Sequence, residues 1–105
     1  MKEVTVQELK ELIDSKEDFQ FVDVREQNEY DFANIGAELI PMSTFRENVE
    51  KFDKERKTII HCRSGKRSGD VITYLEQNHG HENLYNLVGG ILAWSDEIDP
   101  EVPKY

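Results

Sequence analysis

The sequence contains one cysteine, Cys62, and no long apolar run in its 105 residues. A single thiol cannot form an intramolecular disulfide, so the fold does not depend on oxidation, and a free thiol is typical of a reducing, intracellular setting. No segment approaches the ~20 apolar residues of a membrane span. Residues 1–18 carry charges every few positions, which leaves no apolar stretch of the kind that a signal peptide needs. These absences predict a cytoplasmic protein with no membrane partner.

Positive charge is also scarce. The chain has 22 Asp and Glu residues against 13 Lys and Arg, which gives a net charge of −9. Such a surface repels nucleic acid at long range, so nucleic acid is not an expected partner, and solubility is the simplest role of the acidity. The length suits one domain. Because two prolines near the end of the chain disfavour regular structure, we expect a domain over residues 1–99 and a short tail over residues 100–105.

The apolar pattern predicts helices that alternate with strands. Thr5-Val6-Gln7-Glu8 has the spacing of a capping box, in which two side chains bind the backbone at the start of a helix, and Thr44-Phe45-Arg46-Glu47 has the same spacing. We expect helices over about residues 5–16, 26–32, 44–52, 68–77 and 90–98, and strands over 19–24, 37–40, 58–61 and 84–87. This alternation predicts an α/β domain with a mainly parallel sheet. The strand at 58–61 is apolar on both faces and should be central.

The stretch KTIIHCRSGKRSGDVI around Cys62 is the strongest candidate for a functional site. Cys62 follows a strand, at the end where ligands of parallel sheets bind, and precedes a helix. The N–H groups and dipole of the helix N-terminus, together with Arg63, Lys66 and Arg67, would favour the thiolate over the thiol. Gly65 permits a tight loop. The same basic residues would attract an anionic substrate. The alternative is a buried, inert cysteine under a basic surface loop.

Loop length separates two kinds of enzyme that share this order of strand, cysteine, loop and helix. Cysteine-dependent phosphatases place five residues between the cysteine and the arginine that contacts phosphate. Here four residues separate Cys62 from Arg67, and the five-residue spacing falls on Ser68. The shorter loop suits a single sulfur atom attached to Cys62 better than a phosphoryl group.

Four segments resemble motifs of the rhodanese family and occur in that family's order. HCRSGKRS, at residues 61–68, resembles the active-site loop of its single-domain sulfurtransferases. Asp23-Val24-Arg25-Glu26 with Glu29-Tyr30 resembles the DVRE…E(Y/F) segment, residues 35–41 resemble HIxGAxxIP, and residues 86–94 resemble NLxGGxxAW. The match covers about residues 4–98. One departure is Asn34, which stands where the family usually has histidine, in a segment that is one residue short.

This resemblance implies a rhodanese-like three-layer α/β/α sandwich around a parallel sheet of about five strands. It also implies sulfur transfer by a ping-pong route through a persulfide on Cys62. The donor would be thiosulfate or a similar small anion, and the acceptor a thiol, cyanide or a protein. No metal or other cofactor is needed. The active-site loop would consist of Arg63, Ser64, Gly65, Lys66 and Arg67, with its amides on the persulfide and its basic side chains on the donor.

Three charged residues near the predicted site are candidates for orienting the Cys62 loop. Asp23 and Arg25 either orient the loop or form a structural ion pair. Glu29 either accepts hydrogen bonds from the loop or lies in solvent. His61 should be a structural histidine rather than the base, because adjacent strand residues point to opposite faces.

The sequence leaves two other functions open. One is a non-enzymatic module that carries sulfur or docks with another protein. The other is a cysteine-dependent phosphatase or arsenate reductase, which the short loop disfavours.

Overall fold

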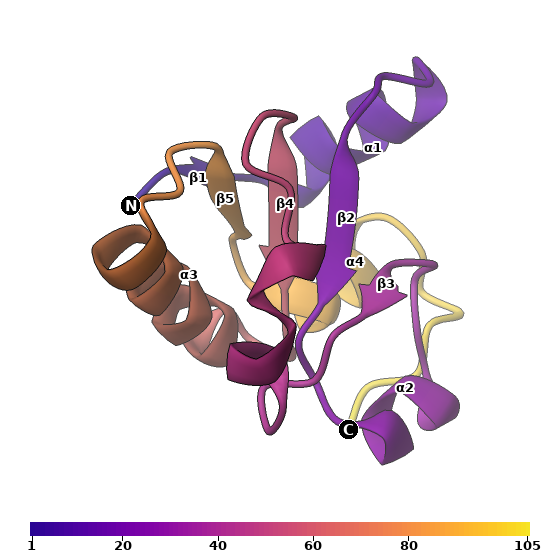
Figure 1. Cartoon of the computed structure of the whole chain (residues 1–105). Coiled ribbons are helices and arrows are strands. Elements are labelled where there is room, and N and C mark those ends of the chain that lie inside the picture. The colour runs from indigo at the N-terminus through magenta and orange to yellow at the C-terminus, as the bar shows by residue number, and fades with distance from the viewer.

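A parallel sheet of five strands lies at the centre of the computed structural model, which describes residues 1–105 (Figure 1). The strands are β1 (Glu3–Val4), β2 (Gln20–Asp23), β3 (Glu38–Leu39), β4 (Thr58–His61) and β5 (Leu84–Leu87). Their order is β1-β5-β4-β2-β3, and every neighbouring pair is parallel. The predicted α/β class, the parallel sheet and the central place of β4 are confirmed. Only β1 has no counterpart among the predicted strands.

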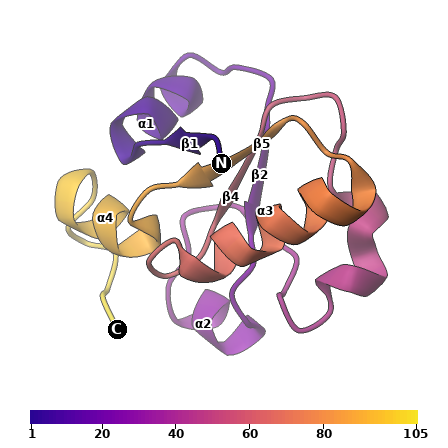
Figure 2. The same ribbon diagram turned by 90° about the vertical axis from the view of Figure 1, so that its left-hand side faces the viewer.

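Helices cover both faces of this sheet. They are α1 (Val6–Asp14), α2 (Gln27–Phe32), the 3-10 helix η1 (Phe45–Lys51), α3 (Lys66–His79) and α4 (Gly90–Glu97). The helices α1 and α4 pack together on one face, and α3 and η1 lie on the other (Figure 2). The structure is therefore the expected three-layer sandwich. None of these helices has the length and apolar character needed to cross a membrane.

The alternation of side chains along β4 divides the core into two clusters. Ile59 points towards α1 and α4 and belongs to a buried cluster with Val4, Val6, Leu9 and Leu87. Ile60 points towards α3 and belongs to a cluster of 11 buried residues that also contains Val71, Ile72, Leu75 and Cys62. Full burial of an aliphatic side chain of this size contributes about 1.5–3 kcal/mol. The backbone that carries Cys62 is thus held by the larger core.

The first residues of the helices test the two predicted capping boxes and the predicted start of the helix after Cys62. Thr5 has the extended backbone of an N-cap, and it forms the predicted capping box with Glu8, at N–O distances of 3.1 and 2.9 Å. The capping box predicted at Thr44 is wrong. The backbone there has φ −129° and ψ 5°, the side chain makes no capping bond, and the element is a 3-10 helix with a kink at Asn48. The helix α3 begins at Lys66, before the predicted start at Ser68.

Candidate active site

Cys62 lies directly after β4, and its side chain is held at the start of α3. Only 1% of the residue is exposed. Gly65, the N-cap of α3, has φ +106°, a conformation that glycine adopts without the strain of a Cβ atom. This geometry points the Gly65 N–H at Sγ of Cys62, with a distance of 3.1 Å between N and S. Because α3 starts at Lys66, the loop is shorter than predicted, and Lys66 and Arg67 belong to the first helical turn.

Two residues that were not predicted as site residues, Ser68 and Asn86, also contact the Cys62 loop. The hydroxyl Oγ of Ser68 lies 3.3 Å from Sγ of Cys62 and donates to Oδ1 of Asn86 at 2.6 Å. The Asn86 amide nitrogen donates to the carbonyl of Gly65 at 2.9 Å. In the sequence, Ser68 stands where a phosphatase loop would have its arginine, and Asn86 begins the segment that resembles NLxGGxxAW. Neither pattern indicated that Ser68 contacts the sulfur or that Asn86 binds Ser68 and Gly65.

The N-terminus of α4 holds the backbone of the loop from the other side. The N–H of Ile91 donates to the carbonyl of Cys62 at 3.0 Å, and the N–H of Leu92 donates to the carbonyl of Arg63 at 3.2 Å. The backbone of Gly90 packs against the same two carbonyls. The Gly89-Gly90 pair of the fourth motif therefore lets α4 approach the residues that carry the sulfur.

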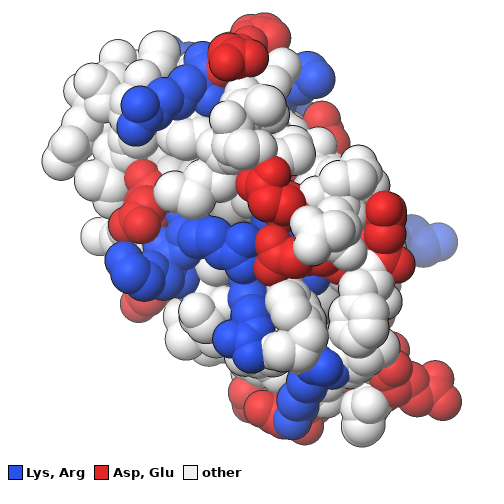
Figure 3. All heavy atoms as spheres, turned by 90° about the horizontal axis from the view of Figure 1, so that it is seen from below, with Lys and Arg blue, Asp and Glu red and all other residues white.

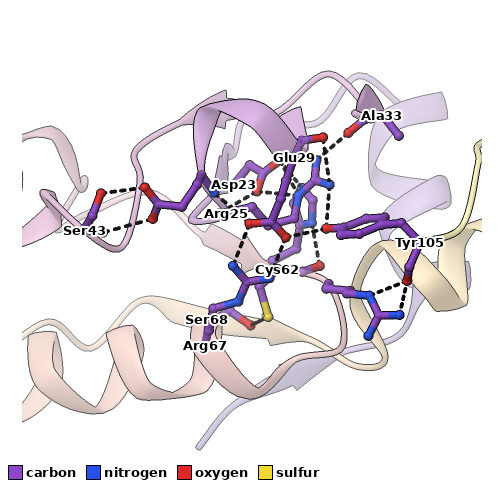
Figure 4. A network of polar contacts seen from close by, with 12 residues as sticks. Asp23, Arg25, Glu29, Ala33, Ser43, Cys62, Arg67, Ser68 and Tyr105 are labelled. Atoms are coloured by element: carbon purple, nitrogen blue, oxygen red, sulfur yellow. Dashed lines mark hydrogen bonds and ion pairs between the residues drawn. The ribbon is translucent and has the colours of Figure 1, made fainter. Parts of the chain in front are cut away.

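Arg67 forms a two-armed ion pair with Glu29 of α2 (Figure 4). Its two terminal nitrogens donate to the two carboxylate oxygens at 2.7 and 2.8 Å. Glu29 also accepts from the Glu26 N–H at 3.0 Å and from the Tyr105 hydroxyl at 2.8 Å. The hydrogen bonds from Arg67, with smaller contributions from Glu26 and Tyr105, lower the pKa of Glu29 to about 2. Glu29 thus accepts hydrogen bonds from the start of α3, and Arg67 points at a protein carboxylate.

Asp23 and Arg25 form a fully buried ion pair behind this contact. Arg25 donates from Nη2 to Asp23 at 2.8 Å and to the carbonyl of Ala33 at 2.6 Å. Burial alone would lower the pKa of Arg25, but the hydrogen bonds of Asp23 and Tyr105 more than offset this, so the pKa is raised. His61 is also fully buried, with Nε2 3.4 Å from Asp23, and burial lowers its pKa. A neutral histidine in this place suits the structural role that was expected.

Arg63 and the last residue of the chain meet over the same region. The Arg63 guanidinium donates to the Tyr105 carbonyl, at 2.6 Å from Nε, and lies over the Tyr105 ring. The Tyr105 hydroxyl accepts from Arg25 at 2.9 Å and donates to Glu29. Residues 100–105 have no helix or strand, yet they fold back onto the loop (Figure 4). No pattern within the short tail indicated these contacts, which join residues up to 80 positions apart.

The remaining loop residues are at the surface. The Lys66 side chain is 84% exposed and lies 3.7 Å from Asp70, and Ser64 is exposed. Viewed from below Figure 1, towards the carboxyl ends of the strands, Lys and Arg side chains gather near the middle of the face (Figure 3). Acidic side chains lie directly beside them, as the pairing of Arg67 with Glu29 requires. Of the basic rim formed by Arg63, Lys66 and Arg67, the two arginines are therefore bound by partners within the chain.

No cavity opens at the sulfur. The largest cavity, about 710 Å³, lies at the opposite end of the sheet, where Gln20, Phe52, His79 and His81 are among its lining residues. Because Cys62 is 1% exposed, a reactant reaches Sγ only when neighbouring side chains move. No three His, Cys, Asp or Glu side chains are grouped to hold a metal ion. The arrangement places Sγ of Cys62 on the Gly65 N–H at the start of α3, where a sulfur-centred anion can be held.

Comparisons with known proteins identify the family of this chain. The model of the rhodanese-like domain family matches residues 5–97. The putative sulfurtransferase YtwF of Bacillus subtilis is 35% identical over 102 residues, which cover 96% of this chain and 97% of YtwF. The probable adenylyltransferase/sulfurtransferase MoeZ of Mycobacterium tuberculosis is 31% identical over 105 residues, which cover 97% of this chain but only 26% of MoeZ.

A solved structure gives the same result for the fold. The rhodanese-like domain protein from Staphylococcus aureus superimposes with a TM-score of 0.83 at 38% sequence identity, and the match covers 100% of this chain and 99% of that one. The chain spans about a quarter of MoeZ and nearly all of YtwF, so the shared unit is one domain. With the family model matching most of its length, the chain belongs to the rhodanese-like domain family.

Proposed function

We propose that this domain is a sulfurtransferase that moves a sulfane sulfur from thiosulfate, or a similar small anionic donor, to a thiophilic acceptor through a persulfide on Cys62. The observation that carries the proposal is the Gly65 N–H, which donates to Sγ of Cys62 at the start of α3. A donor in this place favours a sulfur that bears negative charge. The names of the relatives as sulfurtransferases support the same reaction class.

In the first half-reaction the Cys62 thiolate attacks the outer sulfur of thiosulfate. A bond forms between Sγ and that sulfur, the sulfur–sulfur bond of thiosulfate breaks, and sulfite leaves with the electron pair. The persulfide anion then carries its charge on the outer sulfur. The N–H groups of the first turn of α3, which have no partner within the helix, would stabilise this charge, together with the Gly65 N–H.

In the second half-reaction a nucleophile attacks the outer sulfur of the persulfide. The new bond uses the electron pair of the nucleophile, and Cys62 leaves as a thiolate. Cyanide gives thiocyanate in this step, and a thiolate gives a new persulfide. Splitting the transfer into two displacements is the usual advantage of covalent catalysis.

The basic side chains would take different parts in donor binding. Arg63 would exchange the main-chain oxygen of Tyr105 for an oxygen of the donor, since a doubly charged donor offers the guanidinium several charged oxygens. Arg67 would contribute its charge from a fixed position on Glu29, and Lys66 would attract the donor from the rim. Asp23 and Arg25 would act at a distance, because Asp23 fixes Arg25 and Arg25 donates to the carbonyl of Glu29.

Intact-protein mass spectrometry after incubation with thiosulfate tests the proposal. We expect the mass of one added sulfur atom on the wild-type protein, its removal by cyanide with release of thiocyanate, and no addition to Cys62→Ser. An adduct on Cys62→Ser, or no adduct on the wild type, would refute the assignment. A persulfide that forms but passes to a protein acceptor and not to cyanide would instead identify the sulfur-carrier role.

A further inference from the structure

Ser68 is the polar side chain nearest to the sulfur, and the proposed reaction leaves it unused. It is fully buried, and its Oγ lies 3.3 Å from Sγ of Cys62 (Figure 4). Asn86, which is 7% exposed, accepts from Ser68 and donates to the carbonyl of Gly65. With the Gly65 N–H on Sγ, these contacts form a closed ring around the sulfur.

The single proton of the Ser68 hydroxyl has a defined place in this ring. A carbonyl cannot donate, so the Asn86 nitrogen must face the carbonyl of Gly65 and its oxygen must face Ser68. The Ser68 proton therefore lies on the 2.6 Å bond to Asn86, and a lone pair of Oγ faces Cys62. When Cys62 carries its proton, Ser68 therefore accepts the S–H.

The same contact becomes unfavourable when Sγ carries negative charge. A thiolate has no proton to give, and two sets of lone pairs then face each other across 3.3 Å. Rotation of the hydroxyl about its C–O bond removes this repulsion, because it turns the O–H from Asn86 towards Sγ. Oδ1 of Asn86 loses its donor in this rotation and has to draw back from the 2.6 Å contact with Oγ, but a hydrogen bond to an anion is stronger than one to a neutral oxygen.

We propose that Ser68 is a catalytic residue that stabilises Cys62 as the leaving thiolate when the persulfide is discharged. This inference rests on the proposed persulfide. As the acceptor attacks the outer sulfur, the sulfur–sulfur bond breaks and its electron pair moves to Sγ. The Ser68 hydroxyl turns to donate a hydrogen bond to Sγ and keeps its proton. Sγ has no charge in the persulfide and gains charge only in this step, so the bond is stronger in the transition state than before it.

A single-turnover experiment isolates this step from the formation of the persulfide. Wild type, Ser68→Ala and Thr73→Ala are loaded with thiosulfate, freed of donor and mixed with cyanide, and thiocyanate is followed in time. Thr73 is an exposed hydroxyl on the same helix and makes no contact with the loop. We expect all three proteins to load one sulfur, and Ser68→Ala alone to discharge about tenfold more slowly, which corresponds to about 1.4 kcal/mol.

The outcomes separate the inference from the function on which it rests. If the wild type takes up no sulfur, the proposed function fails. If the wild type loads and Ser68→Ala discharges at the same rate, the role of Ser68 is refuted while the function stands. The role is also refuted if Ser68→Ala takes up no sulfur, or if its rates of sulfur uptake and of discharge fall by the same factor. Either result would mean that Ser68 supports the structure of the loop rather than the leaving group.

Discussion

Replacing Gly90 by alanine should disturb the backbone of Cys62 without touching any polar side chain of the site. Gly90 is the first residue of α4 and has φ +58°. A Cβ atom at this position would lie 2.5 Å from the carbonyl oxygens of both Cys62 and Arg63. These two carbonyls also accept the N–H groups of Ile91 and Leu92. The added methyl group therefore forces α4 and the active-site loop apart.

Two effects determine how much Gly90→Ala lowers the free energy of unfolding. A left-handed backbone costs a residue other than glycine about 1 kcal/mol. Relief of an overlap with backbone atoms costs about 1–3 kcal/mol more, whether through displaced packing or through weakened hydrogen bonds from α4. We expect Gly90→Ala to reduce the free energy of unfolding by about 3 kcal/mol, which is a large part of the ~5–15 kcal/mol available to a typical domain.

Gly80 supplies the matched control. It has φ +70° at the end of α3, and no atom lies within 4 Å of a Cβ built there. Gly80→Ala should thus show the backbone cost of about 1 kcal/mol alone. Urea denaturation at pH 7 measures both losses, and the rate of persulfide formation should fall only for Gly90→Ala. Equal stabilities of the two variants, or a wild-type rate of loading for Gly90→Ala, would show that the contact between α4 and the loop does not position Cys62.

Two further predictions concern the contacts around Arg67 and Arg63. Because the pKa of Glu29 is lowered from 4.5 to about 2, its charge stabilises the fold above pH 4.5, and this contribution is lost as the pH falls towards 2. Glu29→Gln should be less stable than wild type by at most about 3 kcal/mol at pH 7. The difference between the two free energies of unfolding, measured by urea denaturation, should shrink from pH 4.5 towards pH 2. A difference that stays constant with pH would contradict the ion pair with Arg67. Tyr105→Ala keeps the main-chain oxygen that Arg63 binds but removes the ring and the hydroxyl that hold this residue in place. Arg63 should then be freed and the KM for thiosulfate should fall severalfold, whereas Lys104→Ala, which loses an exposed ion pair, should leave the KM unchanged. An unaltered KM in Tyr105→Ala would mean that the tail and the donor do not compete.

The sequence by itself was sufficient for the order of the helices and of every strand except β1, and for the place of the cysteine. The apolar run that becomes β4 and the helical period of α3 that follows it are both patterns among near neighbours along the chain. The same holds for the capping box at Thr5, where the N-cap and its partner are three residues apart. At Thr44 the same spacing failed to give a capping box, and Phe45, the residue that follows, is buried in the larger core.

Only the tertiary structure decided what the charged residues of the site contact. The residues Arg63, Lys66 and Arg67 were expected to face a donor, but Arg67 lies on Glu29, 38 positions away, and Arg63 lies on Tyr105, 42 positions away. The contact of Ser68 with Asn86 likewise depends on the packing of α3 beside β5. Spacing along the chain fixes the direction of a side chain within its own helix or strand. The partner of that side chain depends on which other segment the folded backbone brings within hydrogen-bonding distance, and no local pattern records this.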